Sequence, residues 1–216
     1  MVERFVFPSR EKWLEHRAHG IGGSEISAVV GMNPYMSNVD LWERKAGTVE
    51  AEDISDKPYV QYGVRAEPLM REFFKLDFPQ IEMFYEENNS FRNSKYPWAL
   101  ASLDGWLRDE NGRAGVWECK TTNILQPRQK DKWNHQIPPN YFCQILFYMA
   151  VIEADFTILT ARLKTEYEGL PYSQTRNYII KRAAVQDDMD YLMEKGAEFW
   201  ESVQNGQEPA LLLPEI

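Results

Sequence analysis

The sequence has few cysteines and no long apolar run. Cys119 and Cys143 are its two cysteines, too few for a disulfide framework or an all-cysteine metal site, which favours a reducing compartment. The opening segment, MVERFVFPSREKW, is charged and lacks the apolar stretch of a signal peptide. No segment approaches the ~18 apolar residues that a membrane helix requires. These absences predict a cytoplasmic protein that does not associate with membranes.

The chain also lacks an excess of positive charge. It carries 24 Lys and Arg against 33 Asp and Glu, a net charge of −9. DNA phosphates would be repelled at long range, which argues against a protein that coats nucleic acid nonspecifically. The negative charge does not exclude a nucleic-acid enzyme with a local positive channel and bound metal ions, because a carboxylate cluster for a cation also lowers the net charge.

The sequence shows no internal repeat and no low-complexity segment. Its length of 216 residues, with 44% hydrophobic and 26% charged residues, fits one globular domain over residues 1–216 with a sizeable core. The aromatic content of 13% is high, and we expect most aromatic side chains to lie in that core.

Helical periodicity and capping residues predict six helices. Ser9 and Ser37 are suitable N-caps, and Gly20, Gly31 and Gly47 are suitable helix stops. The predicted helices cover residues 9–20, the later part of 20–31 after a glycine-rich turn, 37–47, 58–74, 140–153 and 186–206.

The fourth predicted helix follows an acidic loop, EAEDISD, at residues 50–56. Val60, Val64 and Phe74 fall along one face of this helix, and Glu67 lies in the same stripe. Pro68 should kink or restart the helix, because it lacks a backbone N–H.

Segments in which apolar and polar residues alternate predict five strands. Asn111-Gly112 is a strong hairpin signal between the second and third of them, and a partly basic loop covers 121–139. Helices alternating with strands predict an α/β or α+β fold, with a central mixed sheet flanked by helices. The predicted strands cover residues 81–86, 97–108, 114–121, 155–163 and 174–183.

The segment VWECKTT (116–122) has the most informative pattern of charge. Side chains alternate along a strand, so Glu118 and Lys120 should share one face while Trp117 and Cys119 share the other. Desolvating either charged group alone costs several kcal/mol, so an interior position requires a partner or a ligand. The simplest alternative to an interior site is that Glu118 and Lys120 lie on a solvated face of the strand.

Asp104 lies near the end of the strand expected to pair with this segment. With a plain two-residue turn at Asn111-Gly112, residue 104 would oppose Cys119 and point away from Glu118. Convergence of Asp104 with Glu118 therefore requires a bulge or an odd-length loop, and we predict one at Gly112 or Gly105.

Two carboxylates and a backbone carbonyl form a suitable site for a hard cation. Mg²⁺ prefers oxygen ligands and keeps several waters, and a nearby lysine could orient or help to deprotonate a metal-bound water. Such a site suits phosphodiester hydrolysis. The residue types alone do not distinguish such a metal site from a solvated strand face.

The glycine-rich block GIGGS (20–24) exposes backbone at the start of a helix, where N–H groups attract phosphate. Arg17 could pair with such a phosphate and the Ser24 hydroxyl could add a hydrogen bond. A tight helix junction beside a surface arginine is the alternative.

Four blocks of the chain resemble the lambda exonuclease family of the PD-(D/E)XK nuclease superfamily, also described as YqaJ-like viral recombinases. Together they cover roughly residues 16–150 in the family's order. The blocks are HRAHGIGGSEISAVVGMNPY, YGVRAEPLMREFF, ASLDGWL with WECKTT, and YFCQILFYM.

The resemblance implies a restriction-endonuclease-like core and specific roles for matching residues. It implies catalytic roles for Asp104, Glu118, Lys120, Glu67 and Gln144. It implies that Mg²⁺, with Mn²⁺ able to substitute, is held by Asp104, Glu118, Glu67 and the Cys119 carbonyl. It implies substrate contacts by Arg17, Ser24, Ser102 and Tyr141, with a terminal 5′-phosphate near Arg17 and Ser24.

The resemblance also implies an activity and partners. The expected enzyme is a 5′-to-3′ exodeoxyribonuclease that degrades linear double-stranded DNA to mononucleotides and leaves 3′ tails. A single-strand annealing protein, a homotrimeric ring and a phage or prophage origin in a bacterial host are implied too. The alternatives are a restriction-type or structure-specific endonuclease and a catalytically silent DNA-binding protein on the same scaffold.

Overall fold

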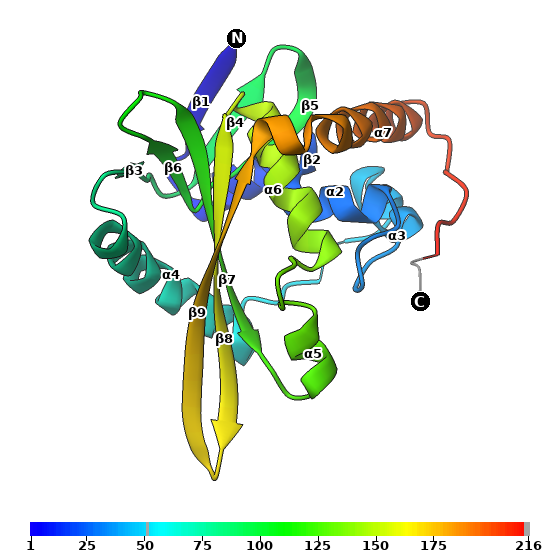
Figure 1. The fold of residues 1–216 in the computed structure, drawn as a ribbon. Helices are drawn as coiled ribbons and strands as arrows, with labels where there is room; N and C mark the ends of the chain where they lie inside the picture. The colour runs from blue at the N-terminus through cyan, green and yellow to red at the C-terminus, as the bar shows by residue number, and fades with distance from the viewer. Residues whose placement is uncertain (51, 214–216) are drawn as a thin grey trace.

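The computed structural model describes residues 1–50 and 52–213, which form two mixed β-sheets with helices on their faces (Figure 1). The fold class is therefore mixed α and β, as predicted, with two sheets where one central sheet was expected. The four-stranded sheet has the order β1 (Val2–Val6), β4 (Asn89–Asn93), β5 (Tyr96–Ala101) and β2 (Ile21–Gly22). The five-stranded sheet has the order β3 (Glu82–Phe84), β6 (Gly105–Arg108), β7 (Ala114–Asn123), β8 (Phe156–Tyr167) and β9 (Leu170–Lys181).

Helix α6 (Pro139–Val151) lies in the core and contacts β5 of one sheet as well as β7 and β8 of the other. Ile145, Leu146 and Met149 of this helix are fully buried. The other helices in the described residues are α1 (Arg10–Arg17), α2 (Gly23–Val29), α3 (Asn38–Lys45), α4 (Pro58–Asp77), α5 (Pro127–Asp131), α7 (Gln186–Gln204) and the 3₁₀ helix η1 (Arg182–Ala184). None of the described helices is both long and apolar enough to cross a bilayer.

The predicted N-caps at Ser9 and Ser37 are confirmed, whereas the first helix ends at Arg17, before the predicted stop at Gly20. The Ser9 side chain accepts a hydrogen bond from the Lys12 N–H, and Ser37 accepts one from Asp40. The second predicted helix starts only at Gly23, because the two residues before it pair with β5 as the short parallel strand β2. The predicted acidic loop at 50–56 precedes α4, and its residue 51 lies outside the described residues.

Helix α4 differs from its prediction in two respects. It runs without a break through Pro68, whose ring lies on the exposed face, where water can satisfy the carbonyl that loses its N–H partner. The buried stripe consists of Ala66, Met70 and Phe74, spaced four residues apart. Val64 is 66% exposed, so the predicted face was wrong at this position.

The strand predicted at 97–108 is divided between the two sheets. β5 ends at Ala101 and β6 begins at Gly105, so residues 102–104 cross from one sheet to the other. The side chain of Asn89 holds this crossing: its Nδ2 donates to the Leu103 carbonyl at 2.8 Å, and its Oδ1 accepts from the Leu103 N–H at 2.9 Å. Asn89 thus supplies the bonds that a neighbouring strand would supply.

The β6–β7 hairpin has the odd-length loop that the sequence predicted. Arg108 pairs with Ala114, and the Asp109 N–H donates to the Arg113 carbonyl at 3.1 Å, which leaves a three-residue loop. Gly112 closes this loop with a φ of +74°, the geometry of a type I turn followed by a bulge. Because Gly105 pairs with Trp117, the register places the residue before Gly105 level with Glu118.

Strands β8 and β9 form a hairpin of 12 residues per strand, longer than the strands predicted at 155–163 and 174–183. Glu168 and Gly169 form its turn, with φ of 52° and 75°, as a two-residue turn between strands requires. This hairpin projects beyond the body of the molecule, with α5 beside it (Figure 1). The segment 121–139, which was predicted to be a loop, contains the end of β7 and the helix α5, which was not predicted.

Candidate active site

A cavity of about 360 Å³ opens where the two sheets meet. Its walls come from α1, α2, α4, α6, β7 and the crossing at residues 102–104. Eight of the predicted site residues line it, namely Arg17, Ser24, Glu67, Ser102, Asp104, Glu118, Lys120 and Gln144. The fold thus brings segments from across the chain to one place, as the predicted site requires.

Glu118 and Lys120 share one face of β7, and Trp117 and Cys119 pack on the other face in a separate apolar cluster with α4. The predicted alternation is confirmed. Lys120 Nζ lies 2.6 Å from Glu118 Oε1, and Gln144 Nε2 donates to the same oxygen at 2.7 Å. Glu118 Oε2 is buried and has no hydrogen-bond partner among the described residues.

The electrostatics of this pair follow from its burial. Burial and the nearby Asp104 carboxylate raise the pKa of Glu118 to about 8, although Lys120 acts in the opposite direction. For Lys120, burial lowers the pKa, but the Glu118 and Asp104 carboxylates outweigh burial and hold the pKa above its usual value. Lys120 is therefore an ammonium ion here, suited to contacting a phosphate oxygen.

Asp104 lies beside β7 on the predicted side. Its Oδ2 accepts a hydrogen bond from the Cys119 N–H at 2.9 Å, which fixes the carboxyl group against the strand that carries Glu118 and Lys120. Asp104 also contributes to the raised pKa values of Glu118 and Glu67. The three charged groups therefore share one electrostatic environment.

Glu67 enters the cavity from α4 and is held by Arg71, a residue that the sequence reading missed. Arg71 Nη2 lies 2.5 Å from Glu67 Oε1 on the next turn of the helix. The guanidinium group lies 3.5 Å from the ring centre of Tyr85. Burial, followed by the Asp104 carboxylate, raises the pKa of Glu67 to about 7 despite this ion pair. The i, i+4 spacing of Glu67 and Arg71 was a signal for this pair.

The carboxylates fit a divalent cation in their chemistry. The described residues contain no ready-made group of three His, Cys, Asp or Glu side chains arranged to hold a metal. Among the described residues, however, Glu118 Oε2 is a buried oxygen without a partner, and burial together with the neighbouring carboxylates raises the pKa of both Glu118 and Glu67. A cation bound by Asp104, Glu118 and Glu67 would give Glu118 Oε2 a partner and would reduce the repulsion among the three carboxylates.

Ser24 of the glycine-rich block and Arg17 of α1 form another wall of the cavity. Arg17 stacks on Trp13 with 4.7 Å between the guanidinium carbon and the ring centre, and its Nη2 donates to Ser24 Oγ at 3.3 Å. The Gly22 N–H is already used, because it donates to Glu25 Oε2 at 2.7 Å. An anion at this wall would therefore contact the Arg17 and Ser24 side chains more than the backbone.

Three other cavity residues have contacts that the sequence did not reveal. The indole N–H of Trp13 donates to Ser102 Oγ and to the Asn89 carbonyl, both at 3.0 Å. Tyr148, one helical turn after Gln144, accepts from Gln144 Nε2 at 3.1 Å. The i, i+4 spacing of Gln144 and Tyr148 could have indicated that both reach the cavity.

Tyr141 lies behind Lys120 and is absent from the cavity wall. Lys120 Nζ is 5.1 Å from the Tyr141 ring centre, and the other side of Tyr141 stacks on the buried ring of Trp133. The predicted direct substrate contact of Tyr141 therefore has no support from its position. The ring instead supports the ammonium group of Lys120.

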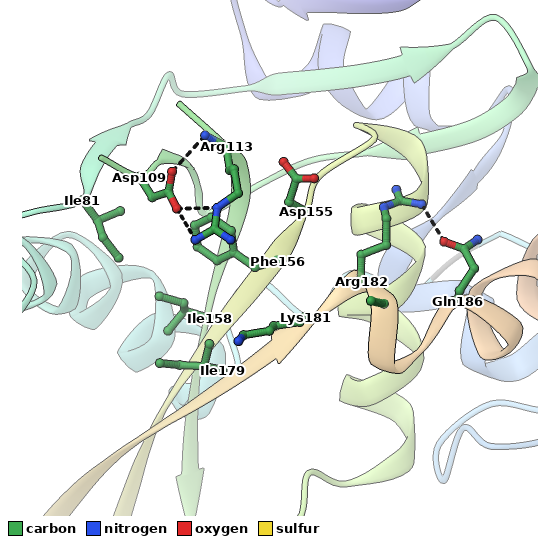
Figure 2. Close-up of a pocket in the computed structure, with 11 residues that line it drawn as sticks. Ile81, Asp109, Arg113, Asp155, Phe156, Ile158, Ile179, Lys181, Arg182 and Gln186 are labelled. Carbon is green, nitrogen blue, oxygen red and sulfur yellow. Dashed lines mark hydrogen bonds and ion pairs between the residues drawn. The ribbon is translucent and has the colours of Figure 1, made fainter. Parts of the chain in front are cut away.

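A larger cavity of about 560 Å³ lies elsewhere, on the β8–β9 side of the five-stranded sheet (Figure 2). Its floor is apolar, and at its edge Arg113 Nε donates to Asp109 Oδ2 at 2.7 Å. No predicted site residue lines it. The smaller cavity is therefore the candidate active site.

Comparison with known proteins gives a family for this arrangement. The model of the YqaJ-like viral recombinase domain matches residues 12–167. The uncharacterized protein YqaJ of Bacillus subtilis (strain 168) is 26% identical over 205 residues, which cover 94% of this chain and 59% of that protein. The chain thus spans about three fifths of the length of this curated relative.

Solved structures share the fold. An alkaline exonuclease from Laribacter hongkongensis superposes with a TM-score of 0.65 at 16% identity, over 90% of this chain and 95% of that chain. Its complex with dAMP gives 0.63 at 18% identity, with the same coverage of both chains. A phage-related exonuclease from Haemophilus somnus gives 0.56 at 10% identity, over 87% of this chain and 96% of that chain.

Proposed function

Because the chain belongs to the YqaJ-like viral recombinase family, we propose that it is a metal-dependent exodeoxyribonuclease. It degrades the 5′-terminated strand of linear double-stranded DNA to mononucleotides and leaves 3′ single-stranded tails. The shared fold with solved exonucleases supports this activity. Dependence on Mg²⁺, the 5′-to-3′ direction and the products belong to the proposal.

The observation that carries the proposal is the convergence of Asp104, Glu118 and Lys120 on one cavity. Asp104 reaches the Glu118 side only because the β6–β7 hairpin has an odd-length loop. A solvated strand face is a poor account of Glu118, which is 2% exposed and has a buried oxygen without a partner. Burying such a carboxylate is costly unless a cation or substrate completes the site.

The residues divide the work as follows. Asp104, Glu118, Glu67 and the Cys119 carbonyl would hold Mg²⁺ or Mn²⁺, and a bound ion supplies Lewis-acid stabilisation of the charge that develops during phosphodiester hydrolysis. Gln144 orients the Glu118 carboxylate through its 2.7 Å hydrogen bond. Lys120 contacts a non-bridging oxygen of the scissile phosphate and holds it in the cavity.

The wall of the cavity formed by Arg17 and Ser24 accounts for strand polarity. Arg17 is free of ion pairs within the described residues and faces the cavity beside Ser24. A terminal 5′-phosphate held there would leave the first phosphodiester near Lys120. Ser102, which also faces the cavity, is placed to contact the same strand.

A single assay tests this function. Linear duplexes with 5′-phosphate or 5′-hydroxyl ends, labelled separately on each strand, are incubated with Mg²⁺ or with EDTA. We expect the 5′-phosphorylated strand to disappear faster, only with Mg²⁺, while the opposite strand persists. Cutting of a covalently closed circle would identify an endonuclease, and binding without any cleavage would identify a DNA-binding scaffold; either result rejects the proposal.

Family membership also supports proposals about assembly. A homotrimeric ring around DNA and a single-strand annealing partner for the 3′ tail follow from the same exonuclease role, in a phage or prophage of a bacterial host. Sedimentation of the chain with and without duplex DNA tests the ring, since a monomer under both conditions contradicts it.

A further inference from the structure

Cations without ionic partners gather at one end of the molecule. Residues 121–135 and 160–176 contain six basic and three acidic residues, in a chain with a net charge of −9. These segments form the α5 region and the projecting β8–β9 hairpin, which lie beside each other in Figure 1. Within the described part of the chain, none of the six takes part in an ion pair: Arg128, Lys130, Lys132, Arg162, Lys164 and Arg176.

A cavity of about 770 Å³ lies along the outer half of this hairpin, and we call it the arm groove. It is defined by Tyr62, Asn123, Leu125, Arg162, Lys164 and Tyr172. Arg162 and Lys164 are both half-buried in its wall. Glu166 is the one acidic residue that lines it within the described residues. The groove is therefore locally positive on a protein that is acidic overall.

Aromatic and apolar groups accompany these cations. Lys164 Nζ lies 3.2 Å from the ring centre of Tyr62, which holds the ammonium group in place. At the rim, Leu125 is 81% exposed and Tyr172 is 65% exposed. Cations beside exposed flat or apolar side chains are the combination that binds single-stranded nucleic acid, because phosphates meet the charges and bases stack on the rings.

The arm groove is separate from the candidate active site. In the β7–β8 ladder, Arg162 lies opposite Thr121 and Lys164 opposite Asn123. The cations are thus one and three residues beyond the level of Lys120, or about 3 and 10 Å along the strand. Because side chains alternate, they point to the α4 side of the sheet, whereas Lys120 points to the α6 side. A ligand must be longer than the catalytic cavity to occupy both sites.

We propose that the arm groove binds single-stranded DNA outside the catalytic cavity. Arg162 and Lys164 pair with phosphates, and Tyr172 and Leu125 contact bases. An acidic peptide would use the charges but would gain less from the flat rim, so single-stranded DNA fits better. The proposal rests on the proposed function for its substrate class, although the groove itself can be tested without catalysis.

The test measures binding of fluorescein-labelled oligo(dT) of about 12 nucleotides by anisotropy, in EDTA so that no cleavage occurs. The double variant R162Q/K164Q should bind at least about tenfold more weakly. The slope of log K against log salt should fall by about 1.4, the value for two single-strand phosphate contacts. The matched control K181Q/K195Q also removes two positive charges, at lysines that do not line the arm groove, and should bind like the wild type.

Two further measurements separate the possible outcomes. The single variant R162Q leaves the contact between Lys164 and Tyr62 intact, so a loss of binding in R162Q with an unchanged melting temperature excludes misfolding. Hydrolysis of a 5′-phosphorylated dinucleotide with Mg²⁺, which needs only the catalytic cavity, should be unchanged in R162Q/K164Q. A third outcome is that neither the wild type nor any variant hydrolyses DNA, while R162Q/K164Q binds oligo(dT) more weakly than the wild type. That result would support the arm groove and reject the proposed function.

The proposal is overturned if R162Q/K164Q binds oligo(dT) as tightly as the wild type. It is also overturned if a blunt duplex of equal length competes better than oligo(dT), because duplex DNA cannot stack its bases on the rim. Equal competition by poly-glutamate at matched charge would identify an acidic peptide as the ligand class and would reject the assignment to DNA.

Discussion

Arg71 donates from its Nε to the backbone carbonyl of Asp104 at 3.1 Å. The same guanidinium pairs with Glu67 on α4, so a single cation connects the Glu67 carboxylate to the backbone of Asp104. Its side chain is 10% exposed and lines no wall of the candidate active site. Arg71 therefore acts from behind the cavity as a positioning residue.

We expect the R71K variant to lose activity by about 10- to 100-fold, the effect of removing groups that orient metal ligands. Lysine keeps the charge but lacks the planar fork that reaches Glu67 and Asp104 together. The Mg²⁺ concentration at half-maximal rate should rise, whereas the DNA affinity in EDTA should not change. K75Q, on the exposed face of the same helix, is the control. Unchanged Mg²⁺ dependence in R71K would refute the positioning role.

The K120A variant should lose cleavage by at least about 100-fold and keep its affinity for duplex ends. Lys120 is the ammonium group beside Glu118, while Arg17 on another wall still contacts the DNA. Single-turnover cleavage and anisotropy measure the two properties separately. K195A, which removes a partly exposed lysine on α7, should retain both. Persistent cleavage in K120A would mean that the catalytic assignment is wrong.

Mg²⁺ should raise the melting temperature of the wild type without any DNA present. An ion that binds the folded state at 100 times its dissociation constant stabilises that state by about 2.7 kcal/mol. The D104N variant should respond much less, because it lacks one of the proposed ligand carboxylates, whereas E198Q on the surface of α7 should respond fully. Equal shifts in D104N and the wild type would place the ion elsewhere.

Two glycine variants should change stability in opposite directions. A Cβ on Gly23 would lie 2.2 Å from Cε1 of Tyr148, so G23A should lower the free energy of unfolding by about 1–3 kcal/mol. Gly63 lies inside α4, and its nearest neighbour would be Thr121 Oγ1 at 3.7 Å, so G63A should raise that free energy by up to about 1 kcal/mol. Urea denaturation of both variants is the measurement. Equal effects of the same sign would show that the contact with Tyr148 does not limit packing.

Local features of the fold were predictable because they depend on short-range chemistry. Ser9 and Ser37 cap helices through their own side chains. Asn111-Gly112, together with the need to bring Asp104 near Glu118, predicted the odd-length loop that the hairpin has. The alternation in VWECKTT likewise predicted which side chains of β7 face the cavity. The caps and the alternation needed only neighbours in sequence, whereas the odd-length loop also depended on the predicted metal site.

Other features depend on partners far along the chain and could not be predicted from local pattern. The strand at 97–108 divides between two sheets because Asn89, more than ten residues earlier, supplies the hydrogen bonds of a neighbouring strand at Leu103. Tyr141 was assigned to the substrate, but Trp133 and Lys120 occupy its two faces. Periodicity predicts which side chains share one face of a helix or strand, but it does not predict which residues pack against that face.

The crossing at residues 102–104 makes the chemistry of this chain depend on two sheets at once. Asp104 follows directly after Leu103, which Asn89 of the four-stranded sheet grips, while the carboxylate itself is tied to the five-stranded sheet at Cys119. A small rotation of one sheet against the other would change the spacing of the acidic groups before any helix unfolded. Strands β1 and β4 touch no reacting atom. Substitutions that destabilise these two strands should nevertheless abolish catalysis at temperatures well below the melting temperature of the protein.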